Sequence, residues 1–151
     1  MELGGIMRWT IGVFLAAFAA ATWAQDIGQI KTLTGSVHVE REGKRLPVQV
    51  GMPVRQADTL VTGADGTVGV TFTDNSLLSA GPNSVLALDR YAFDTTTHAG
   101  QFDASLKKGT LAVVSGKMVK QSPDAMRVHT PTSIMGVRGT EFVVKVNDPG
   151  L

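Results

Sequence analysis

Hydrophobic and polar residues alternate along most of the chain after Gln25, with a period of two rather than the period of an α-helix. In a β-strand successive side chains point to opposite faces, so this alternation predicts half-buried strands. Shorter apolar runs at 60–62, 77–79 and 85–89 are also typical of strands. The segments with clear alternation are 33–40, 67–73, 101–107, 110–114 and 126–130.

Turn-forming residues separate nearly all of these segments. Their spacing is close to the roughly 8–12 residues typical of an all-β sandwich, barrel or solenoid. No segment after residue 25 has the pattern of an amphipathic helix. We therefore predict one all-β domain of short strands over residues 25–147, followed by a tail at 148–151. The predicted turns are Glu42-Gly43, 63–66, Asp74-Asn75, 81–83, Lys108-Gly109, Ser115-Gly116 and 122–124.

The first 24 residues follow a different pattern. After Arg8, residues 9–21 form an unbroken run of apolar and small residues, and Thr22 and Ala24 precede Gln25 as a cleavage site requires. This three-part pattern predicts a secretory signal peptide over residues 1–24. The run is shorter than the ~20 residues of a membrane span, and an uncleaved anchor is the alternative. We expect export to the bacterial periplasm or beyond, with no stable membrane span after cleavage.

Composition narrows the chemistry that the chain can perform. The 151 residues are 43% hydrophobic, carry a formal net charge of +1 and include no cysteine. Such a charge gives no attraction to nucleic acid, and without cysteine there is no disulfide or thiolate site. The histidines His38, His98 and His129 are far apart, so surface histidines are favoured over a metal site. Because no serine elbow, phosphate loop or calcium loop occurs either, we expect no catalytic, cofactor or metal site.

The most specific pattern is HTPTSIMGVRGTEFVVKV, residues 129–146. It resembles the closing signature of FecR-type domains, in which a Thr-Pro pair leads into a Val/Ile-Arg-Gly-Thr-x-Phe strand. Residues 57–94 and 107–128 resemble the middle and joining parts of that family. Ala57 and Asn75 stand where the family commonly has glycine, as tolerated turn variants. The signature residues are Thr130, Pro131, Gly136, Val137, Arg138, Gly139, Thr140 and Phe142.

The resemblance implies an all-β domain whose short strands wrap in a solenoid-like or double-stranded β-helix-like way, in the bacterial envelope. In the best-known members the domain is the periplasmic part of a transmembrane regulator. That regulator receives a signal from an outer-membrane iron transporter and controls a cytoplasmic sigma factor. Only 24 residues precede the expected domain here, too few for a sigma-factor-binding domain. We therefore expect a stand-alone, exported member of the family.

Two glycines, Gly136 and Gly139, are expected to turn the chain before its last strand, through positive φ or close backbone approach. Arg138 between them has two interpretations. The favoured one is structural: it caps backbone carbonyls at the corner or pairs with Glu141. Alternatively, Arg138 and Glu141 contact a partner. In the last strand we expect one face with Phe142, Val144 and Val146, and a second with Glu141, Lys145 and a partly covered Val143.

Three classes of function differ in how well they fit this sequence. The first is a non-enzymatic module for protein interaction and signalling in the cell envelope, with one or more unidentified envelope proteins as partners. The second is a secreted structural or surface protein that binds envelope polysaccharide, which short strands with Thr- and Ser-rich faces would allow. A low aromatic content argues against a stacking platform for sugars or bases. An enzyme is disfavoured because no set of catalytic residues assembles.

Overall fold

The structure, a computed structural model, describes residues 25–147, so the expected signal peptide and C-terminal tail lie outside the described residues. The prediction of an all-β fold is confirmed, with twelve strands and one short helix in the described part. The elements are β1 (Asp26–Thr34), β2 (Val37–Arg41), β3 (Lys44–Pro47), β4 (Pro53–Arg55), β5 (Thr59–Thr62), β6 (Thr67–Phe72), β7 (Leu77–Ala80), β8 (Val85–Phe93), β9 (Gly100–Val114), α1 (Lys117–Gln121), β10 (Met126–His129), β11 (Ile134–Gly136) and β12 (Glu141–Val146).

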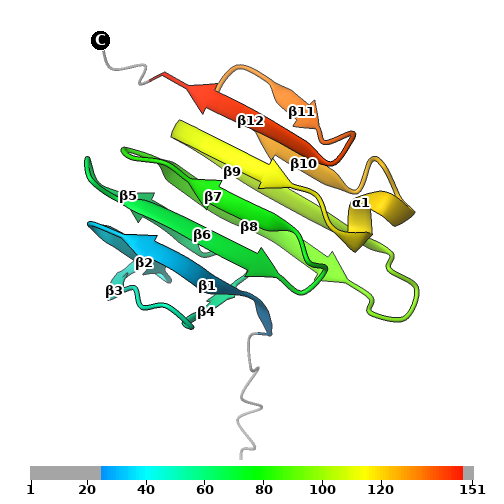
Figure 1. Ribbon diagram of the computed structural model, residues 1–151, viewed down its shortest axis with the longest axis horizontal. Coiled ribbons are helices and arrows are strands. Elements are labelled where there is room, and N and C mark those ends of the chain that lie inside the picture. The colour runs from blue at the N-terminus through cyan, green and yellow to red at the C-terminus, as the bar shows by residue number, and fades with distance from the viewer. Residues whose placement is uncertain (1–24, 148–151) are drawn as a thin grey trace, which may run out of the picture.

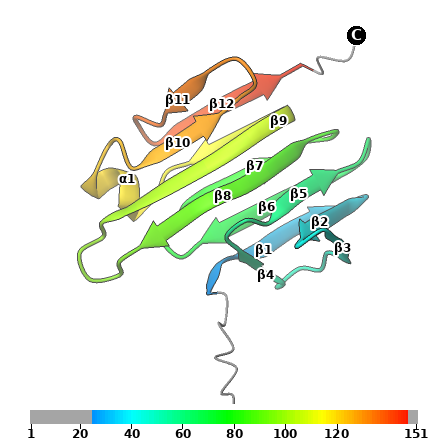
Figure 2. The ribbon, with the colours of Figure 1, turned by 180° about the vertical axis from the view of Figure 1, so that it is seen from behind.

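The strands form one curled sheet that folds over into two facing layers (Figures 1 and 2). The first layer has the order β4-β1-β6-β7-β9-β12. The second has the order β3-β2-β5-β8-β9-β10-β11. All neighbouring strands are antiparallel except β9 and β10, which are parallel. The wrapping of short strands that we expected therefore takes the form of two layers around one core.

Strand β9 belongs to both layers. Its first half pairs with β8 and β10, and its second half pairs with β7 and β12. We predicted a turn at Lys108-Gly109, but the structure has a single strand of 15 residues that changes layer there. A β-bulge falls between Leu106 and Lys108, and Gly109 has φ +97°. A Cβ at Gly109 would collide with Ser84, so only glycine fits this bend.

A second layer change separates β1 from β2. The alternation over residues 33–40 predicted one strand, whereas the structure breaks it at Gly35 and Ser36 and places its halves in different layers. Gly35 has φ +66°, and a Cβ there would collide with the backbone of Asp65. The polar–apolar alternation continues across the break because both layers bury the same side of the chain.

The core between the layers is built from the predicted apolar faces. Val68, Val70 and Phe72 of β6 are each 2% exposed, and Phe102 and Leu106 of β9 are no more exposed than that. The rings of Phe72 and Phe102 meet edge to face, with centroids 4.9 Å apart. Fully burying one such side chain stabilises a fold by about 1.5–3 kcal/mol. The core therefore confirms the period-two reading of 67–73 and 101–107.

The helix α1 was not expected from the sequence. Its five residues are too few to establish a helical period, and only Met118 and Val119 are buried. Met118 lies over Gly100 at the start of β9, where a Cβ would come within 2.9 Å of its methyl group. The helix therefore covers the core beside the start of β9.

A buried turn fixes the chain before this helix. The carboxylate of Asp74, 1% exposed, accepts hydrogen bonds from the N–H and hydroxyl of Ser76, at 3.0 and 2.6 Å. The hydroxyl of Tyr91 also lies within hydrogen-bond distance of this carboxylate, at 3.3 Å. Burial raises the pKa of Tyr91 to about 12. Because the N–H of Lys117 donates to the carbonyl of Asp74 at 2.8 Å, the turn also positions the chain that leads to the C-terminal strands.

Candidate functional site

The signature residues lie at one end of the two layers, around β10, β11 and β12 (Figure 1). The structure divides them into two groups. Thr130, Pro131 and Phe142 line a groove beside β12. Arg138, Gly139 and Thr140 lie in the link between β11 and β12. The remaining two differ in burial: Val137 is 2% exposed, whereas Gly136, the last residue of β11, is exposed.

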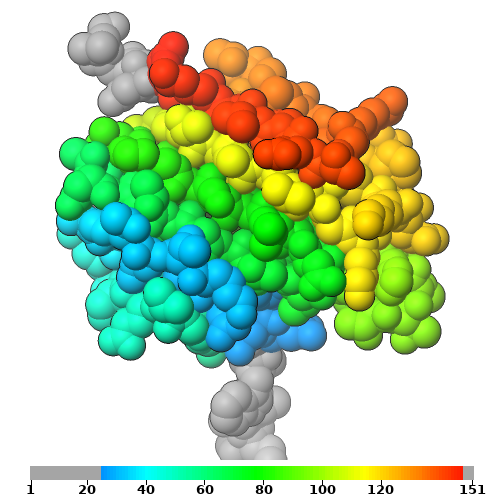
Figure 3. Space-filling view, in the orientation of Figure 1, coloured from blue at the N-terminus to red at the C-terminus, as the bar shows by residue number. Residues whose placement is uncertain are grey.

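The groove has a volume of about 500 Å³ and runs along β12. In the space-filling view β12 forms the edge of the first layer, and β11 is visible beyond it (Figure 3). Phe142, Val144 and Val146 give the β12 side an apolar lining, and Met135 of β11 adds to it. The opposite wall is the segment 130–133. A pocket of this size is within the range that binds ligands in proteins.

The wall at 130–133 is a tight turn that holds its own shape. The N–H of Thr130 donates to the carbonyl of Ser133 at 2.8 Å, and the N–H of Ser133 donates to the hydroxyl of Thr130 at 3.0 Å. Pro131 takes the second position of the turn, where its fixed φ is favourable. The Thr-Pro pair of the signature therefore shapes the groove, in addition to ending β10.

The inward and outward faces of β12 are as predicted, with one exception. Val144 is buried and Phe142 and Val146 are half-buried, whereas Glu141 and Lys145 are exposed. Val143 was expected to be partly covered, but it is 64% exposed. Since β12 is the last strand of its layer, no neighbour in the described part of the chain lies beyond it to cover Val143.

The turn predicted at Gly136 and Gly139 is confirmed at Gly139 only. Gly139 has φ +107°, whereas Gly136 does not have a positive φ and continues β11. The hydroxyl of Ser115 donates to the carbonyl of Gly139 at 2.6 Å. The N–H of Ser115 donates to the carbonyl of Thr140 at 2.9 Å. Ser115, which the sequence places only in a predicted turn, therefore satisfies the carbonyls of this corner.

The structural interpretation of Arg138 is corrected by these contacts. Its guanidinium hydrogen-bonds to neither a corner carbonyl nor Glu141, and instead pairs with Asp124 at 3.2 Å. Both side chains are more than 70% exposed. Surface ion pairs of this kind contribute little to stability. Arg138 and Glu141, the two candidate partner contacts, are both exposed but lie on different parts of this end: Arg138 on the link and Glu141 on β12.

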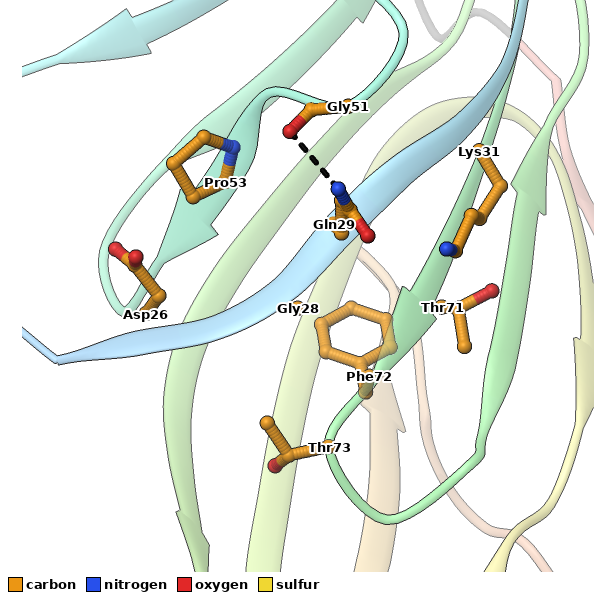
Figure 4. A pocket seen from close by; sticks show the side chains of 9 residues that line it. All are labelled: Asp26, Gly28, Gln29, Lys31, Gly51, Pro53, Thr71, Phe72 and Thr73. Carbon is orange, nitrogen blue, oxygen red and sulfur yellow. Dashed lines mark hydrogen bonds between the residues drawn. The ribbon is translucent and has the colours of Figure 1, made fainter.

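A second pocket lies where β1, β4 and β6 meet (Figure 4). It has a volume of about 510 Å³, and a Cβ at Gly28 in its lining would lie 3.1 Å from the ring of Phe72. The amide of Gln29 crosses it to donate to the carbonyl of Gly51 at 3.1 Å. The only charged side chains lining it are Asp26 and Lys31, and Asp26 pairs with Arg55.

The histidines do not come together in the described chain. His38 lies 3.4 Å from Glu40, and His129 lies 3.6 Å from Asp103. Within residues 25–147, no group of three or more His, Asp or Glu side chains is arranged to hold a metal ion. In the same residues, no helix has the length and apolar character needed to cross a membrane.

Comparison with known families agrees with the C-terminal signature. A family model described as FecR protein matches residues 58–151, from the buried Asp58 before β5 through β12 and the groove beside it. The strands β1 to β4 precede the matched region, although they complete both layers. No curated protein and no solved structure gives a significant match. Because the family model covers more than half of the chain and includes the signature residues, this chain belongs to the FecR protein family.

Proposed function

We propose that this chain is an exported, non-enzymatic FecR-type module that binds another protein of the bacterial cell envelope. Membership of the FecR family suggests a signalling-related module. The signal-peptide pattern of residues 1–24 supports export to the periplasm or beyond. Signalling by a module without an active site requires a surface on which a partner can bind.

The groove beside β12 is the observation that carries this proposal. It joins an apolar lining to an exposed strand edge, and the Thr-Pro pair and Phe142 of the family signature line it. Val143 and Ile134, which are 64% and 65% exposed, are the two most exposed large apolar residues in the described chain, and both lie at this end. Val143 lines the groove and Ile134 precedes Met135, which also lines it, and exposed apolar residues of this size favour a protein-binding surface.

A second candidate function, polysaccharide binding, has one observation in its favour. A hollow of about 300 Å³ on the outer face of the first layer is lined by the hydroxyls of Thr32, Thr67, Ser79 and Thr110. A Cβ at Gly69 would collide with the hydroxyl of Thr32, so that glycine leaves room for one of these side chains. Hydroxyl groups can hydrogen-bond a sugar, but the hollow lacks an aromatic ring on which a sugar could stack. We therefore place protein binding first.

The test is affinity capture of the tagged chain from the envelope of its native host after brief chemical crosslinking, with mass spectrometry of what is retained. The control bait is an unrelated exported β-domain of similar size. We expect one or a few envelope proteins to be enriched over the control. Retention of cell-wall polysaccharide without an enriched protein would contradict protein binding and favour the second candidate.

A further inference from the structure

The outer edge of β12 presents free backbone groups in a regular order. In an antiparallel ladder, alternate residues turn their N–H and C=O groups toward the neighbouring strand. The carbonyl of Thr140 accepts from Ser115, so Thr140 and the even-numbered residues after it face β9. Glu141, Val143 and Lys145 therefore direct their backbone groups outward. No strand of the described chain other than β9 pairs with β12.

The space beside this edge has the shape of a missing strand. Beyond β9, the second layer continues with two strands, β10 and β11, whereas the first layer continues only with β12. The second layer is thus one strand longer at this end, and β11 has no strand of the first layer over it. The groove lies in this position, with Met135 and Phe142 in its lining and the 130–133 turn as its wall.

The same difference in length disfavours a second copy of the chain as the occupant. Two β12 strands paired edge to edge would be related by a two-fold axis perpendicular to the layer. Because the second layer of each copy extends past its own β12, the β11 of one copy would meet the β11 of the other. A single extended peptide segment meets no such obstruction.

The side chains of β12 specify the chemistry of that segment. Glu141 and Lys145 stand on the outward face on either side of Val143, and opposite charges across neighbouring strands attract. An antiparallel segment would place an acidic residue beside Lys145 and a basic residue beside Glu141. Its intervening residues beside Val144 and Phe142 would point into the apolar groove. Read from its N-terminus, the segment is acidic–apolar–any–apolar–basic.

We infer that β12 binds an extended segment of a partner protein as an added antiparallel strand, with this acidic–apolar–any–apolar–basic pattern. The inference rests on the proposed function and specifies how the partner is held. The partner's main chain pairs with Glu141, Val143 and Lys145, and its apolar side chains fill the groove over Met135. Recognition by strand addition draws affinity from main-chain hydrogen bonds and specificity from alternate side chains.

The first experiment titrates the purified domain, residues 25–151, with two synthetic peptides, followed by NMR shifts or fluorescence anisotropy. One is acetyl-Thr-Glu-Val-Thr-Val-Lys-Thr-amide, and the other has Glu and Lys exchanged. We expect the first peptide to bind more tightly by about threefold or more, because each opposite-charge pair contributes modestly. In the double variant Glu141→Lys/Lys145→Glu we expect the preference to reverse. Equal binding, no binding, or a preference for the exchanged peptide in the parent would overturn the inference.

The second experiment compares Val143→Pro with Val143→Thr. Proline removes the outward N–H at the centre of the edge, while the bonds from Thr140, Phe142 and Val144 toward β9 remain, as in natural edge strands. Threonine is the control because it keeps the N–H and the β-branched shape. We expect Val143→Pro to bind the first peptide about tenfold more weakly than Val143→Thr, as the loss of main-chain hydrogen bonds requires. Equal affinities in two folded variants would overturn the inference.

A third measurement applies if the proline variant fails to fold. One variant carries a photo-crosslinking amino acid in place of Val143, and a second carries it in place of Val50. Val50 is equally exposed, at 63%, but lies between β3 and β4. With the first peptide we expect crosslinks from position 143 and none from 50. In the native host, a partner crosslinked from 50 alone would keep the proposed function and overturn strand addition. If the peptide bound at β12 but no envelope protein was captured, strand addition would be supported and the proposed function would be contradicted.

Discussion

Residues with positive φ lie where the chain turns between strands and, at Gly109, where β9 changes layer. Gly136 and Gly139 provide a direct comparison, because a Cβ on either residue would meet no atom within 4 Å. Only Gly139 has a positive φ, of +107°. The two glycines of the signature therefore differ in backbone conformation and not in the space around them.

We expect Gly139→Ala to lower the free energy of unfolding by about 1–3 kcal/mol, because alanine disfavours this backbone conformation. Gly136→Ala should leave stability unchanged or raise it by up to about 1 kcal/mol, since the residue lies in a strand. Urea denaturation of both variants measures the difference. Equal effects would show that positive φ at Gly139 does not matter for stability.

Ala57 and Asn75, where the sequence departs from the family's glycines, are also explained at this scale. Both have positive φ, +72° and +68°. Asparagine tolerates this region better than alanine, because its side chain can hydrogen-bond locally. The departures are thus turn variants, as expected, and Ala57 carries the greater strain.

Replacement of Ala57 by glycine should accordingly stabilise the domain by about 1 kcal/mol, the relief of strain outweighing the added entropy of the unfolded chain. Ala92→Gly serves as the control, because Ala92 is exposed in β8 without a positive φ. We expect that change to destabilise the domain. Thermal melting of both variants tests this, and a lower melting temperature for Ala57→Gly would contradict the strain.

At the scale of elements, the link between β11 and β12 is held by Ser115 rather than by Arg138. Ser115 follows β9 and donates both its N–H and its hydroxyl to the link. Arg138 forms only an exposed pair with Asp124. The sequence drew attention to the arginine because it belongs to a recognisable motif, whereas the serine is close to the link only in space.

This arrangement predicts opposite outcomes for two alanine variants. Ser115→Ala should lower the free energy of unfolding by about 1 kcal/mol through the lost hydroxyl hydrogen bond to Gly139. Arg138→Ala should change it by less than about 0.5 kcal/mol, as for other exposed ion pairs. Chemical denaturation separates the two cases. A large loss in Arg138→Ala alone would restore a structural role for the arginine.

The alternation of polar and apolar residues indicates which face of a strand is buried, so this property of the elements could be predicted. The strands over 67–73 and 101–107 were predicted with their buried faces, because burial on one side imposes a period of two. The layer change at Gly35 was not predicted, because the alternation continues through it. At Gly109 the buried positions shift from even-numbered to odd-numbered residues, a pattern that predicts a turn between two strands rather than a layer change within one. The groove was also missed, since it results from one layer having an extra strand, and no local pattern records the number of strands.

At the scale of the whole molecule, one buried tyrosine connects stability to pH. Tyr91 is the only tyrosine in the sequence and is 7% exposed. Burial, its leading cause, raises the pKa of the phenol from 10.0 to about 12. The folded state therefore keeps the proton at pH values where the unfolded chain loses it. The stability from this group is complete below pH 10 and is lost as the pH rises through about 12.

We expect the melting temperature of the parent to fall between pH 10 and 12 more steeply than that of Tyr91→Phe, which has no phenol to ionise. The ultraviolet absorbance of tyrosinate follows the same group without interference from another tyrosine. The same pH dependence of the melting temperature in both proteins, or an ionisation of Tyr91 at the ordinary pKa of 10.0, would contradict this assignment.

The passage of β9 through both layers determines when the molecule can fold. Until residues 100–114 are available, β7 and β8 each lack the neighbour that lies between them and the C-terminal strands. Neither layer can therefore be completed ahead of the other as the chain is synthesised from its N-terminus. We therefore expect folding to be a single late event, which cannot be completed before residue 114 has left the ribosome.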